Sequence, residues 1–320
     1  MISRTLSQTQ STPQRPNLSL QARKSRWFYI FVSPWLIGFV LLTVIPLGAA
    51  LGMSFTNFDG LNSANLRFVG FDNYTAALSD HEAWFALTRT LVFALLNVPL
   101  TLIVALCLAF MLTQRIFAQG IFRTFFYIPS IIPIVAVAWV WKLMMNNNFG
   151  LVNAALDVIL PGTYVRWMTE YPTFVLVLLS LWIGTGGTML IFLAGLQGVP
   201  KELEEAARID GANFIQVFFA ITIPFLSPVI FYQLILGILG SLQVLVQPLL
   251  LAPTTGRGVL ATTPPRDNYV FMVHVFQEIF GSQRYGYGSA LLWLFFILIL
   301  ALTLVVFYTG RYWVYYEVEQ

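Results

Sequence analysis

Residues 289–308 read SALLWLFFILILALTLVVFY, a stretch of 20 residues without a charged side chain. A helix of about 20 apolar residues crosses the hydrocarbon core of a bilayer. Five other uncharged runs of similar length lie at 27–55, 90–112, 124–141, 172–199 and within 211–256. Because lipid offers backbone groups no partner, such runs must form helices. The sequence therefore predicts an all-α integral membrane protein with six transmembrane helices.

The composition points to the same class of protein. Of the 320 residues, 58% are hydrophobic and 10% are charged, whereas ordinary soluble domains are about 45–50% apolar and about 25% charged. So few charges cannot cover a water-facing surface, which excludes a soluble enzyme, a disordered protein and a nucleic-acid binder. The single cysteine, Cys107, excludes a disulfide framework and a cysteine-ligated metal site. His81 and His274 fall outside the runs and lack ligand spacing, so we expect loop residues and no metal site.

The two chain ends predict an orientation. Residues 1–26 are polar and proline-interrupted and end in a basic cluster, which predicts a disordered tail held at an anionic lipid surface. The segments on the tail's side of the membrane carry ten of the 17 Lys and Arg residues, although their links are the shorter ones. Segments rich in Lys and Arg tend to lie on the cytoplasmic side of a membrane. We therefore expect the N-terminal tail and the C-terminal residues 311–320 to be cytoplasmic.

The link between the fourth and fifth runs is the most informative. Residues 200–228 read PKELEEAARIDGANFIQVFFAITIPFLSP. Pro200 and the acidic residues after it suit the first turn of a helix, and Gly211 suits its end because glycine adopts a left-handed backbone. Apolar residues at helical spacing follow and lead into a helix kinked at Pro224. The pattern predicts a helix–turn–helix across one membrane face, whereas a plain connection needs only a few residues.

This link resembles the EAA motif of ABC importer permeases. The resemblance lies in Glu205-Ala-Ala, a glycine after three more residues, and Ile-x-Ile-Pro224 after a further nine. Ile223 stands where the family usually has leucine. The DGA at 210–212 and Pro228 are similar to the carbohydrate-importer branch.

Other stretches carry the resemblance over roughly residues 30–310. They are SPWLIGF at 33–39, FVGFDNY at 68–74, FRTFFYIP at 122–129 and GLVN at 150–153. Together they resemble the first permease of a heterodimeric sugar or glycerol-phosphate system. The last outside loop, 251–288, departs from the family, because 254–259 read TTGRGV where a Thr-x-Gly-Gly-Pro stretch is frequent.

The resemblance implies a type I ABC importer permease fold. Residues 27–87 would form the first membrane helix and an outside loop, and 88–310 a five-helix core with a coupling loop at 200–224. It also implies partners: a second, similar permease, two ATPase subunits that bind the ATP, and an extracytoplasmic solute-binding protein. The chain itself would be no enzyme and would hold no cofactor, and it would lie in the cell membrane of a prokaryote. The ATPase-coupling residues would be Glu205, Ala206, Ala207, Asp210, Gly211, Ala212 and Pro224.

The residues themselves agree that energy must come from elsewhere. A phosphate-binding loop needs a lysine directly after a glycine, and none of Lys24, Lys142 and Lys201 follows one. An ion-coupled carrier would bury ionisable groups in its spans, and the six runs contain none. The secondary carrier stays open as the alternative function.

Polar and small residues in the fourth and fifth runs suggest a pathway for a sugar or related polyol. Hydroxyl groups of a solute need amide and hydroxyl partners, and glycine lets the backbone approach a ligand. The substrate-pathway candidates are Gly184, Gly187, Gln233, Gly237 and Ser241. Helix packing is the competing explanation for each, because small residues and amides also join membrane helices. A non-sugar solute such as glycerol phosphate also remains open.

Overall fold

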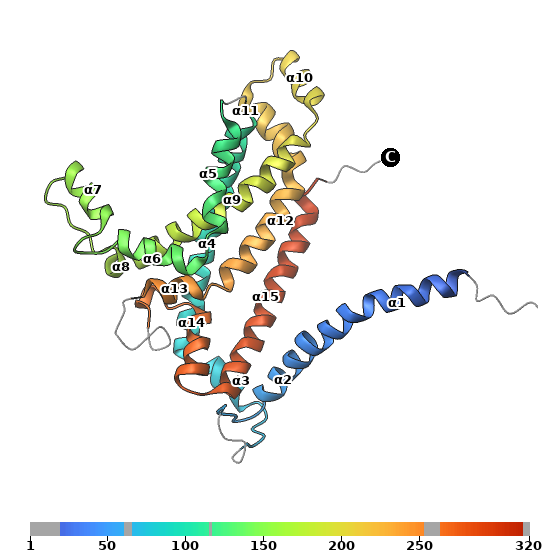
Figure 1. Cartoon of the computed structure of the whole chain (residues 1–320), viewed down its shortest axis with the longest axis vertical. Coiled ribbons are helices and arrows are strands. Elements are labelled where there is room, and N and C mark those ends of the chain that lie inside the picture. The colour runs from blue at the N-terminus through green and yellow to red at the C-terminus, as the bar shows by residue number, and fades with distance from the viewer. Residues whose placement is uncertain (1–19, 61–65, 115–116, 253–262, 316–320) are drawn as a thin grey trace, which may run out of the picture. The chain divides into compact units, whose positions relative to one another are not determined.

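The computed structural model describes residues 20–60, 66–114, 117–252 and 263–315 (Figure 1). The all-helical class predicted from the sequence is confirmed. The chain divides into two compact units, residues 1–52 and 53–320. The long helices of the second unit are α4 (His81–Thr113), α9 (Pro172–Gln197), α12 (Ile223–Leu242) and α15 (Tyr285–Trp313). The shorter helices there are α3 (Asp72–Ser79), α5 (Gln119–Ile131), α6 (Ile134–Met144), α7 (Leu151–Ile159), α8 (Trp167–Glu170), α10 (Lys201–Ile209), α11 (Phe214–Val217), α13 (Val246–Leu251) and α14 (Phe271–Phe276).

The first unit is one helical rod in its described part. α1 (Leu20–Phe39), a π-helical turn (Val40–Val44) and α2 (Ile45–Ser54) follow each other directly. α1 begins seven residues before position 27, so the disordered tail predicted over 1–26 is too long, and residues 1–19 lie outside the described part. Phe31 and Leu42 are 78% and 81% exposed. A rod with such side chains on its surface suits hydrocarbon rather than water.

Within the described residues, five helical segments are long and apolar enough to span a membrane: Lys24–Ser54, His81–Thr113, Pro172–Gln197, Phe214–Leu242 and Tyr285–Trp313. The third predicted run is not a single helix, because α5 and α6 meet at an angle of 98°. Ile132 between them is extended, with ψ 135°. Pro133 causes this break, since its ring disfavours helical backbone at the preceding residue and it has no N–H to donate. A sixth span exists only if the bent pair is counted as one.

The helices extend beyond the uncharged runs. α4 begins at His81, so His81 belongs to a helix and not to the loop that the sequence predicted. α15 likewise continues to Trp313, past the boundary expected at 310. A helix predicted only from an uncharged run is too short, because the ends of a membrane helix carry charged side chains that reach water. His274, also expected in a loop, is 2% exposed and lies within α14.

Asp80 marks the start of α4. Its side chain accepts a hydrogen bond from the Glu82 N–H at 2.8 Å, and the Tyr287 hydroxyl donates to it at 2.6 Å. Burial raises the pKa of Asp80, but these hydrogen bonds outweigh burial and hold the pKa below its ordinary value. The ionised carboxylate therefore ties the beginning of α4 to α15, at a helix end where a negative charge is favourable.

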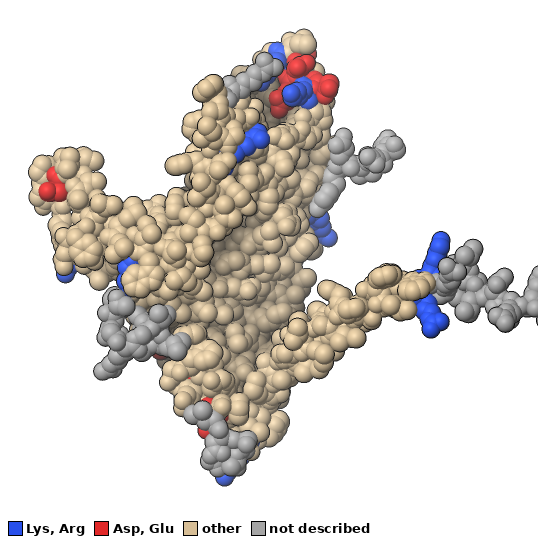
Figure 2. All heavy atoms as spheres, viewed as in Figure 1, with Lys and Arg blue, Asp and Glu red and all other residues tan. Residues whose placement is uncertain are grey.

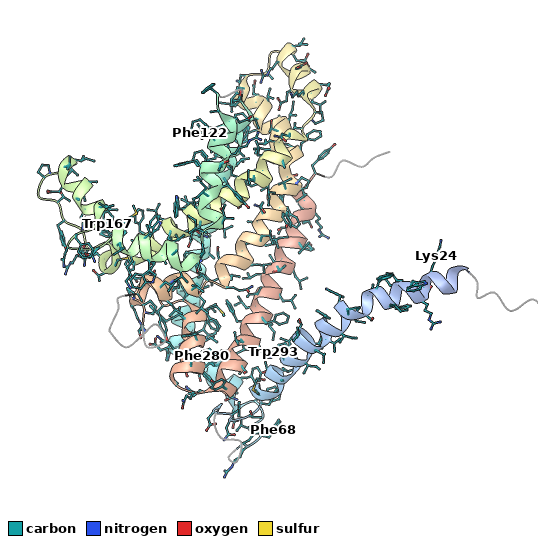
Figure 3. The ribbon with its side chains drawn as sticks, viewed as in Figure 1. Lys24, Phe68, Phe122, Trp167, Phe280 and Trp293 are labelled. Atoms are coloured by element: carbon teal, nitrogen blue, oxygen red, sulfur yellow. The ribbon has the colours of Figure 1, made fainter. Side chains whose placement is uncertain are left out.

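The second unit has two contrasting ends. α10 and α11 lie at one end, and α3 and α14 lie at the other (Figure 1). Figure 2 shows acidic and basic side chains gathered around α10, while the bundle between the ends is almost without them on this face. In Figure 3, Phe122 of α5 lies toward the first end and Phe280 toward the second. We call these the α10 end and the α14 end.

Two adjacent glycines of α9 have different surroundings. A Cβ atom on Gly186 would lie 2.3 Å from the carbonyl oxygen of Phe126 and 2.7 Å from Oγ of Ser130, both in α5. A Cβ atom on Gly187 would meet nothing within 4 Å. Gly186 is therefore the point at which α9 and α5 approach each other closely, and Gly187 faces open space.

This difference predicts unequal effects of the same substitution. Gly186→Ala should lower the stability of the protein by about 1–3 kcal/mol relative to Gly187→Ala, because the added methyl group displaces the α5 backbone. Both changes gain the same helix propensity, about 1 kcal/mol, so the difference isolates the clash. Thermal unfolding of the two purified variants in detergent measures it. Equal midpoints would contradict the close approach of α5 and α9.

Candidate functional site

A cavity of about 450 Å³ lies among α4, α5, α9 and α12. All five residues predicted for the substrate pathway line it: Gly184 and Gly187 of α9, and Gln233, Gly237 and Ser241 of α12. The three α12 residues are spaced by four, so helical periodicity places them on one face. The structure brings the five residues to one cavity, and their role in binding a solute stays a prediction.

Hydrogen bonds from polar side chains join the helices around this cavity. Asn97 of α4 donates from Nδ2 to Oγ of Ser241 at 3.1 Å. Ser130 of α5 donates from Oγ to the carbonyl of Ile183 at 2.7 Å and accepts from the N–H of Gly187 at 3.2 Å. Ser130 also lines the cavity. Part of the polar lining is therefore structural, as the packing explanation expects.

Other polar atoms of the cavity lining do not join helices by hydrogen bonds. Oδ1 of Asn97, Oγ1 of Thr101 and Oγ of Ser180 are buried, and within the described residues they have no hydrogen-bond partner. Buried polar atoms in proteins are nearly always paired, so three unpaired atoms in the wall of one cavity distinguish it from ordinary helix packing. Sequence reasoning missed Thr101 and Ser180. The signal was their spacing, because Thr101 follows Asn97 by four residues and Ser180 precedes Gly184 by four.

The lining is polar without being charged. None of the described residues that line the cavity is Asp, Glu, Lys, Arg or His. Hydroxyl, amide and glycine backbone groups alternate there with Phe93, Leu102 and other apolar side chains. Such a surface pairs with the hydroxyl groups and the apolar ring faces of a neutral solute. This surface offers no charge to balance that of an anionic or cationic solute.

The predicted helix–turn–helix is present at the α10 end. α10 ends in a left-handed turn at Gly211, whose φ is +88°. The N–H of Ala212 donates to the carbonyl of Ala207 at 2.9 Å, and that of Gly211 to Arg208 at 3.1 Å. These two bonds form a Schellman motif, which satisfies the last carbonyls of the helix and reverses the chain.

The second part of this turn is capped and anchored. Asn213 begins α11 with a capping box, in which its side chain accepts from the Gln216 N–H at 3.0 Å and its own N–H donates to Gln216 at 2.8 Å. Phe110 of α4 packs edge-on against Phe214 and Phe218, with ring centroids 5.4 and 5.3 Å apart. α11 is thus fixed to the bundle. The capping box was legible in the sequence as Asn-x-x-Gln but was not recognised.

The predicted coupling residues divide into exposed and structural ones. Glu205, Ala206 and Asp210 are exposed on α10 and its end, while Ala207 and Ala212 are half-buried and close the turn. Pro224 lies just after the π-helical turn Phe218–Thr222, inside the continuous helical segment Phe214–Leu242, where proline favours an irregular backbone. Ile209, which the sequence did not single out, is 87% exposed beside Asp210. An apolar tip with an acidic flank is a surface suited to a partner.

Comparison with known proteins identifies a protein family for this chain. A family model described as "Binding-protein-dependent transport system inner membrane component" matches residues 103–316. The chain belongs to this family. The part of the chain matched by this inner membrane component family begins within α4 and includes both the cavity-lining α9 and α12 and the α10–α11 turn.

Curated relatives of this family match nearly the whole chain. The probable ABC transporter permease protein YesP of Bacillus subtilis is 36% identical and covers 91% of this chain and 93% of its own length. The trehalose/maltose transport system permease protein MalF of Thermococcus litoralis is 32% identical, with 92% and 96% covered. In fold, the chain is similar to a solved bacterial ABC transporter involved in the import of alginate, with TM-score 0.74, 21% identity and coverage of 91% and 97%.

The unpaired cavity atoms predict an unusual pattern of stability. Thr101→Val should leave the stability unchanged or higher, because the lost hydroxyl has no partner in the described residues. Thr90→Val on the same helix should cost about 1–3 kcal/mol, because Thr90 Oγ1 accepts the Phe271 N–H at 2.8 Å and donates to the Ala86 carbonyl at 2.9 Å. Thermal unfolding in detergent distinguishes the two. A comparable loss in both variants would show that Thr101 is bonded within the protein.

Proposed function

We propose that this chain is one half of the membrane pathway of an ATP-driven importer for a sugar or related polyol. The observation that carries the proposal is the uncharged polar cavity with its three unpaired atoms, Asn97 Oδ1, Thr101 Oγ1 and Ser180 Oγ. The family and the names of the relatives support the proposal. MalF of Thermococcus litoralis is named a trehalose/maltose permease, and a further relative, 31% identical, is named an arabinooligosaccharide permease. A phosphorylated solute fits less well, because the described lining offers no cation.

The orientation proposed for the pathway follows from charge. The α10 end, with its concentration of charged side chains, faces the cytoplasm together with both chain termini. The α14 end then faces outward, where a solute-binding protein delivers the solute. A second, similar permease completes the pathway, because the cavity is lined from one side by the helices of this chain.

Coupling to ATP takes place through the α10–α11 turn. Two ATPase subunits bind the ATP and hold one such turn from each permease. Glu205 and Asp210 would face cationic groups of the ATPase, and Ile209 would fill an apolar part of its groove. Ala206 leaves the exposed face of α10 thin enough to enter that groove. When the ATPases close, the turns move together and the pathway opens outward.

Transport in vesicles tests the function. Vesicles that hold this chain with its second permease, its ATPase and its binding protein should accumulate a radiolabelled neutral sugar, from a panel of trehalose, maltose and arabinooligosaccharides, only with internal ATP. Ser241→Trp should lower this uptake about tenfold or more, since an indole fills much of the cavity. Leu95→Trp, at an α4 residue that is 75% exposed, is the control and should transport normally.

Two outcomes would overturn the proposal. Uptake by this chain alone, driven by an ion gradient without ATP, would make it a secondary carrier. Uptake of glycerol phosphate in preference to every neutral sugar would replace the solute class while leaving the ATP-driven mechanism in place.

The turn at Gly211 gives a separate prediction for coupling. Gly211→Val should reduce solute-stimulated ATP hydrolysis roughly tenfold without preventing insertion, because a β-branched residue strains the backbone at φ +88° by about 1–3 kcal/mol. Gly211→Asn is the matched variant and should retain most of the stimulation, since asparagine tolerates this conformation. No atom lies within 4 Å of the added Cβ, so crowding does not contribute. Full stimulation in the valine variant would dissociate the turn from coupling.

A further inference from the structure

The cavity is covered at its α14 end by a short helix. α12 ends at Leu242, and the chain turns through Gln243 and Leu245 into α13. Val244 and Gln247, from this turn and from α13, line the cavity together with Phe93 of α4. α13 therefore lies where a solute would pass between the cavity and the α14 end.

α13 is packed against α6, the second arm of the bent pair. Val244, Leu249 and Leu251 belong to one buried cluster with Val137 and Trp141 of α6. This contact is apolar, and apolar surfaces that face each other inside a membrane gain little from meeting, because lipid chains are an equally good surrounding. Packing alone is a weak means of holding α13 in place.

Lys142 of α6 supplies a polar attachment. Its Nζ donates to the carbonyl oxygen of Leu250 at 3.4 Å and to that of Ala252. These carbonyls end α13 and carry the partial negative charge of a helix C-terminus, so a cation there is favourable. Within the described residues, Lys142 is the only side chain hydrogen-bonded to this helix. Trp139 lies on its other side, with the ring centroid 5.5 Å from Nζ.

The charge of Lys142 has no acidic partner among the described ion pairs. The other ion pairs near the α14 end hold different segments. Arg89 binds Asp267 at 3.0 Å, and Arg266 binds Glu82 at 2.7 Å, which fixes residues 266–268 to α4. Phe271 at the start of α14 is held by Thr90. α13 can thus leave α6 while these ion pairs and this hydrogen bond remain intact; what must break is its apolar packing against α6 and α9 and the Lys142 hydrogen bonds.

We propose that α13 is a gate across the α14 end of the cavity and that Lys142 is the positioning residue that holds it shut. This inference rests on the proposed function, in which the α14 end faces outward. With the gate shut, the cavity is closed to the outside. Opening moves α13 away from α6, and water then replaces the two carbonyl groups around Nζ of Lys142.

Thiol labelling measures the gate directly. Gln247→Cys, made on a Cys107→Ala background, places a reporter at the wall of the cavity. The change is made in the chromosomal copy, and an impermeant maleimide is added to right-side-out vesicles without nucleotide. Lys142→Met keeps an unbranched side chain one atom shorter and removes its donors, so it should raise the labelling rate about tenfold, as for the loss of a charge-assisted hydrogen bond. Lys142→Arg keeps the cation and should label at close to the original rate.

A second reporter separates failure of the gate from failure of the orientation. Leu160→Cys, at a position that is 55% exposed after α7, should be labelled from outside at the same rate in all variants. No labelling at 160 from outside would overturn the proposed orientation. Normal labelling at 160 with unchanged labelling at 247 in Lys142→Met would overturn the gate alone.

Dependence on nucleotide distinguishes a gate from a merely stabilising lysine. In the unaltered background, a non-hydrolysable ATP analogue with solute-loaded binding protein should raise labelling at 247, because the pathway then opens outward. In Lys142→Met, labelling should be high before the analogue is added and rise little afterwards. If Lys142→Met fails to accumulate, Lys142→Gln, which keeps a neutral donor, replaces it and should give an intermediate rate. A response to nucleotide that is the same with and without Lys142 would overturn its role.

Discussion

Hydrocarbon provides no hydrogen-bond partner, and every irregular point of this chain is placed under that constraint. The long helices satisfy their own backbone groups. At two irregular points of the bundle, polar side chains bond to a neighbouring element. Ser130, two residues before the α5–α6 break, bonds to α9. After the turn that follows α12, the carbonyls at the end of α13 accept hydrogen bonds from Lys142. The α5–α6 break and the turn after α12 lie next to the cavity, where protein or water can replace lipid around the backbone.

The cavity is maintained at a cost in stability. Each of its three unpaired polar atoms forgoes a hydrogen bond of about 1–3 kcal/mol, and an apolar lining would avoid this. Two adjacent glycines of α9 likewise differ in what they allow. Gly186 allows α5 to approach, whereas Gly187 leaves space in the cavity, although the two are neighbours in sequence. Close packing and an open cavity thus set different requirements for adjacent residues of one helix.

Much of this arrangement is legible in the sequence, and the exceptions have physical causes. The α12 face was predictable because Gln233, Gly237 and Ser241 repeat every four residues. The α10–α11 turn was predictable because only glycine adopts positive φ without strain. The two glycines of α9 could not be assigned, since the neighbour of each depends on α5, which is distant in sequence. The proline pair Pro129 and Pro133 indicates a kink in the third run, but the division into two helices was not predicted, because an uncharged proline does not interrupt a hydropathy run. His274 was misplaced because it is buried against Tyr269 and Asp80, contacts that join three separate segments.

The bend between α5 and α6 makes bilayer thickness a variable for this protein. α5 has 13 residues and rises about 20 Å, whereas the hydrocarbon core is about 30 Å thick. α5 is therefore too short to cross the core by itself, and α6 continues from it at an angle of 98°. Longer acyl chains widen the gap that α5 leaves unspanned, and shorter ones narrow it. The lipid composition of the membrane thus affects this bend more than it affects the helices that span the bilayer in full. Because α6 follows the bend and Lys142 of α6 binds the end of α13, the effect extends to α13.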